Sequence, residues 1–148
     1  MSALAFVQRM LTWRLFARRE EESGIFSIIK WWELRRLPFN LAVGATGFVT
    51  VIVTLAVAVI TSEKFDEPLG LPDPPIIALF AVIGYGIGAN VCFTVGWVAE
   101  ILVKTIWRER AGAFGQIHFV FGLVFSILLT LTPAVLFTGL LFLRVLRR

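Results

Sequence analysis

Residues 38–61 read PFNLAVGATGFVTVIVTLAVAVIT, a run of 24 positions without Asp, Glu, Lys or Arg. An α-helix rises 1.5 Å per residue, so about 20 apolar residues cross the roughly 30 Å hydrocarbon core of a bilayer. Residues 76–99 and 117–143 are two further uncharged runs of similar length. The chain of 148 residues is 58% hydrophobic, above the usual share for soluble domains. We therefore predict an all-α integral membrane protein with three transmembrane helices.

The segments outside these three runs differ in composition and suggest different positions. Residues 1–37 are expected to form an amphipathic arm on the membrane surface. Pro38 disfavours helical geometry at Leu37, so we expect the arm to bend there into the first span. The second span is expected to continue to about residue 108. The remaining segments are an outer Pro-rich loop, a cytoplasmic loop and a basic tail, at residues 62–75, 109–116 and 144–148.

The distribution of Lys and Arg among these segments predicts the orientation of the chain. A cytoplasmic N-terminus places ten basic residues on the cytoplasmic side of the membrane and four on the outer side, and the opposite orientation reverses these numbers. The basic tail is the exception, since three spans place it outside. We expect a multi-pass protein of the inner, cytoplasmic membrane with its N-terminus in the cytoplasm. The net charge of +4 then reports orientation, and no nucleic-acid partner is expected.

The stretch KWWELRRLPFN, residues 30–40, concentrates aromatic and charged residues at the entry to the first span. Tryptophan is frequent at headgroup depth, and arginine binds the phosphates of anionic lipids. This favours an interfacial anchor in which Glu33 and Arg36 pair along the helix. The alternative is a surface that docks on another subunit. The expected lipid or partner contacts are Trp31, Trp32, Arg35 and Arg36.

The second span contains small and polar residues that are typical of helix contacts within a membrane. Gly84 and Gly88 have the GxxxG spacing, which lets another backbone approach closely. Asn90 and Trp97 are seven residues apart and share a face of the helix. A buried amide requires a partner, and Asn40, just inside the first span, could lie at a neighbouring depth. We expect these five residues to contact helices of this chain or of an oligomer.

Glu100 and His118 are the remaining titratable candidates near the cytoplasmic ends of the spans. Lys104 follows Glu100 by one helical turn, which favours a surface ion pair over a proton or cation site. His118 is the single histidine, and one histidine with one carboxylate makes a poor metal site. Cys92 is the only cysteine, which excludes a Cys-rich metal site. We expect at most a polar cluster of Glu100 and His118, with no catalytic residue, metal or cofactor.

Two segments of the chain together resemble a pattern found in small, uncharacterised bacterial inner-membrane proteins. In that pattern a W-E-x-R-R-L-x-[FY]-N elbow precedes the first span, and an asparagine-aromatic segment lies in a later one. The matching residues are Trp32, Glu33, Arg35, Arg36, Leu37, Phe39 and Asn40, followed by Asn90, Phe93 and Trp97. Phe39 occupies the [FY] position, where tyrosine would have added a hydroxyl group to the elbow. The resemblance implies a bacterial inner-membrane location and no particular activity.

The leading functional hypothesis is a non-enzymatic structural or accessory subunit. It would self-associate or join other membrane subunits, since three helices with many small residues bury little surface alone. The alternative is an oligomeric pore or small transporter, lined by Asn40, Asn90, Thr94 and Glu100. The third class is an intramembrane enzyme, whose only candidate residues are Tyr85, Glu100 and His118.

Overall fold

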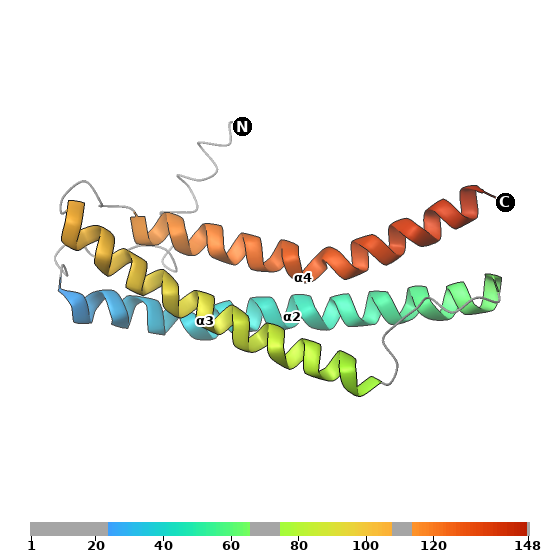
Figure 1. Cartoon of the computed structure of the whole chain (residues 1–148), viewed down its shortest axis with the longest axis horizontal. Coiled ribbons are helices and arrows are strands. Elements are labelled where there is room, and N and C mark those ends of the chain that lie inside the picture. Colours follow the sequence, from blue (N-terminus) through green and yellow to red (C-terminus); the bar gives the residue numbers. More distant parts are fainter. Residues whose placement is uncertain (1–23, 66–74, 108–113, 148) are drawn as a thin grey trace. The chain divides into compact units, whose positions relative to one another are not determined.

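The computed structural model describes residues 24–65, 75–107 and 114–147, and these residues are helical almost throughout (Figure 1). The helices are α2 (Ile25–Phe65), α3 (Pro75–Trp107) and α4 (Phe114–Leu146). Each contains a stretch long and apolar enough to cross a membrane. This confirms the predicted all-α class, and the chain is a small multi-pass membrane protein. The predictions for residues 1–23, 66–74, 108–113 and 148 lie outside the described residues.

Helix α2 runs without interruption through Pro38, so the predicted helix boundary between residues 37 and 38 is wrong. Proline at this position removes one backbone donor and leaves the carbonyl of Leu34 without its usual helical partner. Membrane helices tolerate this loss because their surroundings and small local adjustments of the helix satisfy the freed groups. The segment expected to lie in the membrane plane, residues 25–37, is therefore the first part of one 41-residue helix.

The described helix ends follow local backbone chemistry. The carbonyl of Gly24 accepts hydrogen bonds from the amides of Ser27 (3.0 Å) and Ile28 (3.2 Å), which begins α2. Helix α3 begins at Pro75, as expected of a proline in the first turn. Helix α4 continues to Leu146, so most of the segment predicted as a basic tail belongs to the helix.

The three helices contribute to two compact units. Of the described residues, the first unit comprises 24–39, 90–107 and 114–123, and the second comprises 40–65, 75–89 and 124–147. Each unit thus takes one section from each of α2, α3 and α4.

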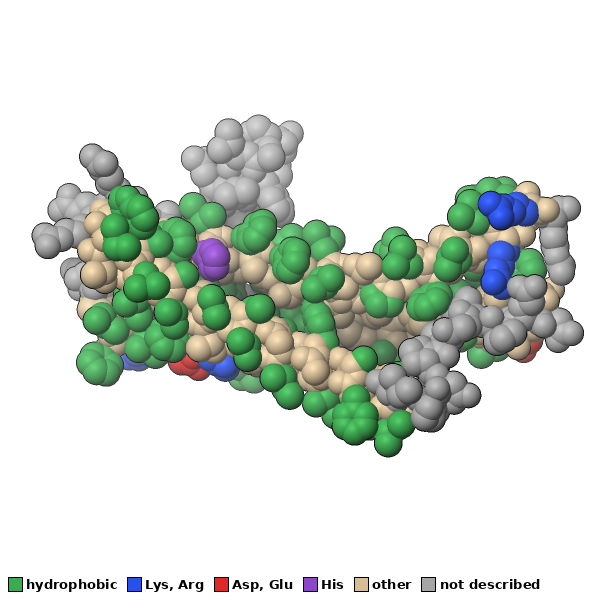
Figure 2. All heavy atoms as spheres, viewed as in Figure 1, with side chains coloured by type: hydrophobic (Ala, Val, Ile, Leu, Met, Phe, Trp, Pro, Cys, Tyr) green, Lys and Arg blue, Asp and Glu red, His purple; other side chains and the backbone are tan. Residues whose placement is uncertain are grey.

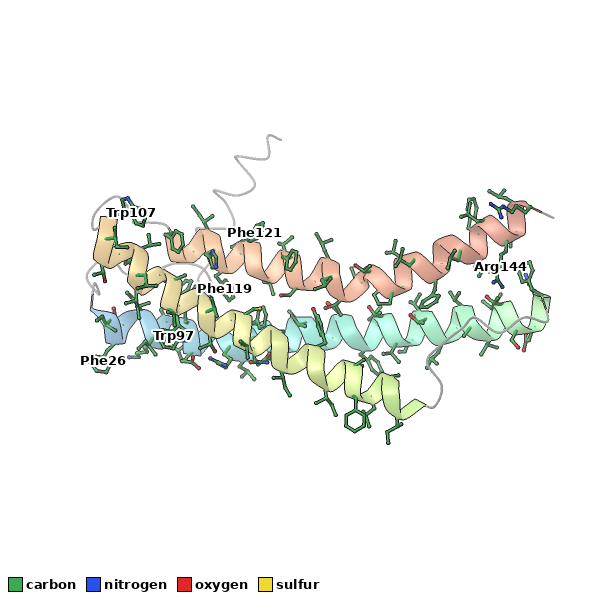
Figure 3. The ribbon with its side chains drawn as sticks, in the orientation of Figure 1. Phe26, Trp97, Trp107, Phe119, Phe121 and Arg144 are labelled. Carbon is green, nitrogen blue, oxygen red and sulfur yellow. The ribbon has the colours of Figure 1, made fainter. Side chains whose placement is uncertain are left out.

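The first unit has an aromatic core. In its described part, the C-terminal section of α3 packs against the N-terminal sections of α2 and α4 (Figure 1). Phe119 projects from α4 into the space between α4 and α3, where its ring centroid lies 6.2 Å from that of Phe93 (Figure 3). The buried apolar residues of this unit are Ile28, Trp31, Trp32, Phe39, Phe93 and Phe119.

The second unit is held by small residues and hydroxyl groups. Val43, Thr50 and Val57 are buried at intervals of seven along α2, which corresponds to one face of a helix. The Thr50 hydroxyl donates to the carbonyl of Thr130 on α4 (2.9 Å), one turn before Pro133. Helix α4 bends in this region (Figure 1), as expected of a proline inside a helix.

Apolar side chains also cover the outward faces of the helices. Figure 2 shows hydrophobic groups along much of the visible surface of the described residues. At most 17% of the most apolar window of any span is buried inside the chain. In water such a surface would drive aggregation, whereas in a bilayer it is the surface that lipid solvates.

Candidate functional site

The most unusual side chain of the first unit is Glu100, which lies on α3 with no exposed surface. Its Oε2 accepts a hydrogen bond from the indole Nε1 of Trp32 on α2, at 2.7 Å. Its Oε1 lies 3.1 Å from Nζ of Lys104, one turn further along α3. The ion pair with Lys104 was predicted from spacing, but its expected surface position is wrong. Burial of an ionisable group costs free energy unless it is paired or hydrogen-bonded, and the contacts with Trp32 and Lys104 offset this cost for Glu100.

Two glycines make room for this arrangement. A Cβ on Gly115, at the start of α4, would overlap the Glu100 carboxylate. A Cβ on Gly96 would lie 2.7 Å from Cη2 of the Trp32 ring, closer than carbon atoms pack. Both positions therefore require glycine, because the helices approach each other through the missing side chains. Neither glycine was recognised in the sequence as part of a site.

Trp32 links Glu100 to the aromatic core. Its ring is 2% exposed and makes edge contacts with Phe93 and Phe119, at centroid distances of 5.2 and 5.7 Å. It also lies 6.5 Å from the ring of His118, which in turn stacks on Phe114 at 5.4 Å. Trp32 thus contacts both members of the predicted polar cluster, Glu100 through a hydrogen bond and His118 through its ring.

Trp31 and Arg35 lie inside the first unit as well. Trp31 packs edge-on against Trp32 and Phe119, with centroid distances of 5.6 and 5.9 Å. The Arg35 guanidinium lies 3.9 Å above the Trp31 ring and donates to the Trp31 carbonyl at 2.9 Å. Trp31, Trp32 and Arg35 are each at most 8% exposed. The expectation that these three face lipid is corrected, since their surfaces are used in packing this chain.

Arg36 forms a second polar connection between α2 and α3. It pairs with Glu33 at 2.7 Å, as the i, i+3 spacing predicted. Its Nη2 donates to the Thr94 hydroxyl at 3.1 Å, and its Nη1 reaches the Asn90 side-chain oxygen at 3.5 Å. The sequence indicated that Asn90 requires a partner, and in this unit that partner includes Arg36. We call the four residues Glu33, Arg36, Asn90 and Thr94 the Arg36 clamp.

Replacing Arg36 with methionine is expected to lower the free energy of unfolding by about 1–2 kcal/mol. The change keeps the aliphatic stem and removes the bonds to three side chains, and bonds of this kind average about 0.6 kcal/mol each in membrane proteins. The half-exposed pair with Glu33 adds little to this sum. The measurement is denaturant titration of the protein in detergent micelles. Lys30→Met, at an exposed position of the same helix, is the control and should change little. An equal loss of unfolding free energy in both variants would show that the Arg36 clamp does not contribute to stability.

The remaining predicted contact residues are less enclosed. Trp97 is half-buried on α3 (Figure 3), and its indole Nε1 is buried without a hydrogen-bond partner among the described residues. Asn40 is half-buried on α2 in the second unit. Gly84 and Gly88 are exposed, and a Cβ added to either meets no atom within 4 Å. The GxxxG spacing is therefore not used for packing within the second unit.

Tyr85 connects α3 with α4 in the second unit. Its hydroxyl donates to the carbonyl of Ser126 at 2.9 Å and lies 2.6 Å from the Thr130 hydroxyl. The Tyr85 hydroxyl is therefore used in packing α3 against α4. Gly84 and Gly88, on the same helix, are both exposed.

Chemically, these groups connect helices. Among residues 24–65, 75–107 and 114–147, no three His, Cys, Asp or Glu side chains lie close enough to hold a metal ion. No protein-family model matches the chain, and no curated protein and no solved structure is detectably similar to it.

Proposed function

We propose that this protein is a non-enzymatic structural or accessory subunit that associates with a second copy of itself inside the membrane. The observation that carries the proposal is the open face of α3 around Gly84 and Gly88. Small residues at this spacing allow two helix backbones to approach closely, and van der Waals packing then replaces contacts with lipid. Gly84 and Gly88 are both exposed in the second unit, which leaves them available to another helix.

The polar residues of the first unit support a connecting role over a transport role. A pore or transporter requires polar groups that line a shared path. Asn90 and Thr94 bond to Arg36, and Glu100 bonds to Trp32 and Lys104. Asn90, Thr94 and Glu100 were candidates for lining a pore, and each of them instead contacts other side chains of this chain. A transport function is therefore the weaker hypothesis, and liposome flux measurements would revive it if they showed permeation.

The location proposed for the subunit follows from charge and from the resemblance noted above. The excess of Lys and Arg in the N-terminal part supports a cytoplasmic N-terminus. The elbow pattern at residues 32–40 supports a bacterial inner membrane. Periplasmic or cytoplasmic reporter fusions at the two chain ends would test the orientation, and opposite compartments are the expected result.

Cys92 provides a direct test of self-association. It is the only cysteine, it is exposed, and it follows Gly88 by one turn of α3. Mild oxidation in membranes is expected to give a disulfide-linked dimer. Gly88→Leu should reduce cross-linking about tenfold, which corresponds to ~1.4 kcal/mol of association free energy.

Matched controls separate the α3 face from general effects of added bulk. Gly44→Leu adds the same side chain to α2, where an added Cβ also meets no atom within 4 Å. This variant should cross-link like the unmodified chain, and Cys92→Ser should give no dimer. Native mass measurement in mild detergent gives the stoichiometry. A monomer by mass, together with no cross-link in membranes, would refute the proposal.

A further inference from the structure

Lys30 on α2 is an exposed base whose nearest acidic neighbour along the helix is already engaged. Glu33 lies three residues from both Lys30 and Arg36, so either base could pair with it. Both carboxylate oxygens of Glu33 bond to Arg36, at 2.7 Å from Nη2 and 2.8 Å from Nε. Arginine holds a carboxylate with two N–H groups at once, a geometry that lysine does not offer. Within residues 24–65, 75–107 and 114–147, no hydrogen bond or ion pair engages the Lys30 ammonium group.

The other charged side chains described in the first unit are also used within the chain. Arg35 is buried, and its guanidinium lies over the Trp31 ring. Lys104 pairs with Glu100. Lys30 is thus the one exposed base in the described part of this unit, and it has no acidic partner there.

The surface that follows Lys30 along α2 is apolar and faces outward. Leu34, Leu37 and Leu41 share the helix face of Lys30, and they are 67%, 68% and 64% exposed. In a membrane-spanning helix such a stripe contacts the acyl chains of lipids. Lys30 lies one turn, or about 6 Å, outside Leu34, which corresponds to the depth of the headgroups. Side chains of a helix lean toward its N-terminus, so the ammonium group is directed away from the hydrocarbon.

We propose that Lys30 binds the phosphate group of an anionic lipid in the leaflet that surrounds the start of α2. The ammonium group supplies N–H donors and a full positive charge, and the phosphate supplies acceptor oxygens. A zwitterionic lipid carries its own cation beside the phosphate, whereas phosphatidylglycerol carries a negative charge that Lys30 can compensate. The lipid contact expected from sequence at Trp31, Trp32 and Arg35 thus belongs to the neighbouring lysine. This site acts within one chain and does not depend on self-association.

Native mass spectrometry of the full chain in non-ionic detergent tests the proposal, with phosphatidylglycerol and phosphatidylcholine added separately. We expect the unmodified chain to bind phosphatidylglycerol more tightly. Lys30→Gln should weaken this binding about fivefold (~1 kcal/mol), the contribution of one basic residue near a membrane surface, and should leave phosphatidylcholine binding unchanged. Lys30→Arg keeps the charge and should bind like the unmodified chain. Both variants should keep its free energy of unfolding in lipid-free micelles, so a change in lipid binding is not a loss of folding.

Lys64→Gln is the matched control, since it removes the same charge at another exposed position of α2. Glu63 precedes Lys64 and is also exposed, so these two residues together carry no net charge for a phosphate to compensate. This variant should retain the preference for phosphatidylglycerol, and excess inorganic phosphate should not displace the lipid.

Four results would each overturn the proposal. The first is a Lys30→Gln variant that binds phosphatidylglycerol as tightly as the unmodified chain. The second is a Lys30→Arg variant that binds it as weakly as Lys30→Gln, and the third is an equal loss in Lys64→Gln. The fourth is displacement of the lipid by inorganic phosphate, which would show that the lysine recognises free phosphate instead of a lipid.

Discussion

Gly115→Ala is expected to destabilise the protein by about 3 kcal/mol or more. The added Cβ would overlap the Glu100 carboxylate, so α4 must move away or the carboxylate must leave its partners. Overpacking alone costs roughly 1–3 kcal/mol, and breaking a buried ion pair costs roughly 3–5 kcal/mol. The free energy of unfolding in detergent micelles measures the loss.

Gly122→Ala is the matched control for this substitution. Gly122 lies on the same helix and in the same unit, and a Cβ there meets no atom within 4 Å. Since alanine has the better helix propensity by about 1 kcal/mol, this variant should be as stable as the parent or slightly more so. If the two alanine variants behave alike, the close approach at Gly115 does not contribute to stability.

Trp32→Ala is expected to lower the free energy of unfolding by about 4 kcal/mol, as is usual for the loss of a large buried aromatic side chain. The indole is 2% exposed and contacts rings from all three helices, so its removal leaves a cavity at the centre of the first unit. The same change removes a hydrogen-bond donor from Glu100. Denaturant titration in micelles again provides the measurement.

One further substitution separates the contribution of packing from that of hydrogen bonding, and a second is a control at an exposed tryptophan. Trp32→Phe keeps an aromatic ring and removes the N–H, so a loss of about 1–2 kcal/mol is expected. Trp107→Ala removes an indole that is 54% exposed and should change the free energy of unfolding little. A Trp32→Ala variant as stable as Trp107→Ala would show that the aromatic cluster does not hold the first unit together.

The hydrogen-bonded groups matter because the bilayer changes which interactions distinguish one packing from another. Burying an apolar side chain between membrane helices exchanges lipid contacts for protein contacts, with no hydrophobic gain from water. Polar pairs such as Trp32–Glu100, Arg36–Thr94 and Tyr85–Ser126 are directional and form in one arrangement only. They therefore specify which helix faces meet, while shape complementarity at the glycines fixes how closely they meet.

Local contacts along one helix were accessible from sequence. Glu33–Arg36 and Glu100–Lys104 were predicted from their spacing alone, and both ion pairs are present. Residues three or four apart lie on the same side of a helix whatever its surroundings, so no tertiary information is required. The predicted helix boundary at Pro38 was wrong, because the local preference of proline does not end a long membrane helix at this position.

Contacts between helices were not accessible in this way. Trp32 and Glu100 are separated by 68 positions, and no feature of either segment indicates that the two side chains meet. Trp31 and Trp32 were expected at the membrane surface because tryptophan is frequent at headgroup depth, yet both side chains are buried. Gly96 and Gly115 were overlooked because a glycine's role depends on which side chain approaches it from another helix.

Three long uncharged runs are enough to predict an all-α protein with three membrane-spanning helices, because uncharged length is a property of each segment alone. The enclosure of Glu100, its hydrogen bond with Trp32 and the exposure of Gly84 and Gly88 became visible once the helices were packed together. These features depend on how each helix is rotated about its own axis. A helix that is apolar on all sides does not indicate which side faces its neighbours, and only packing against the other helices selects one.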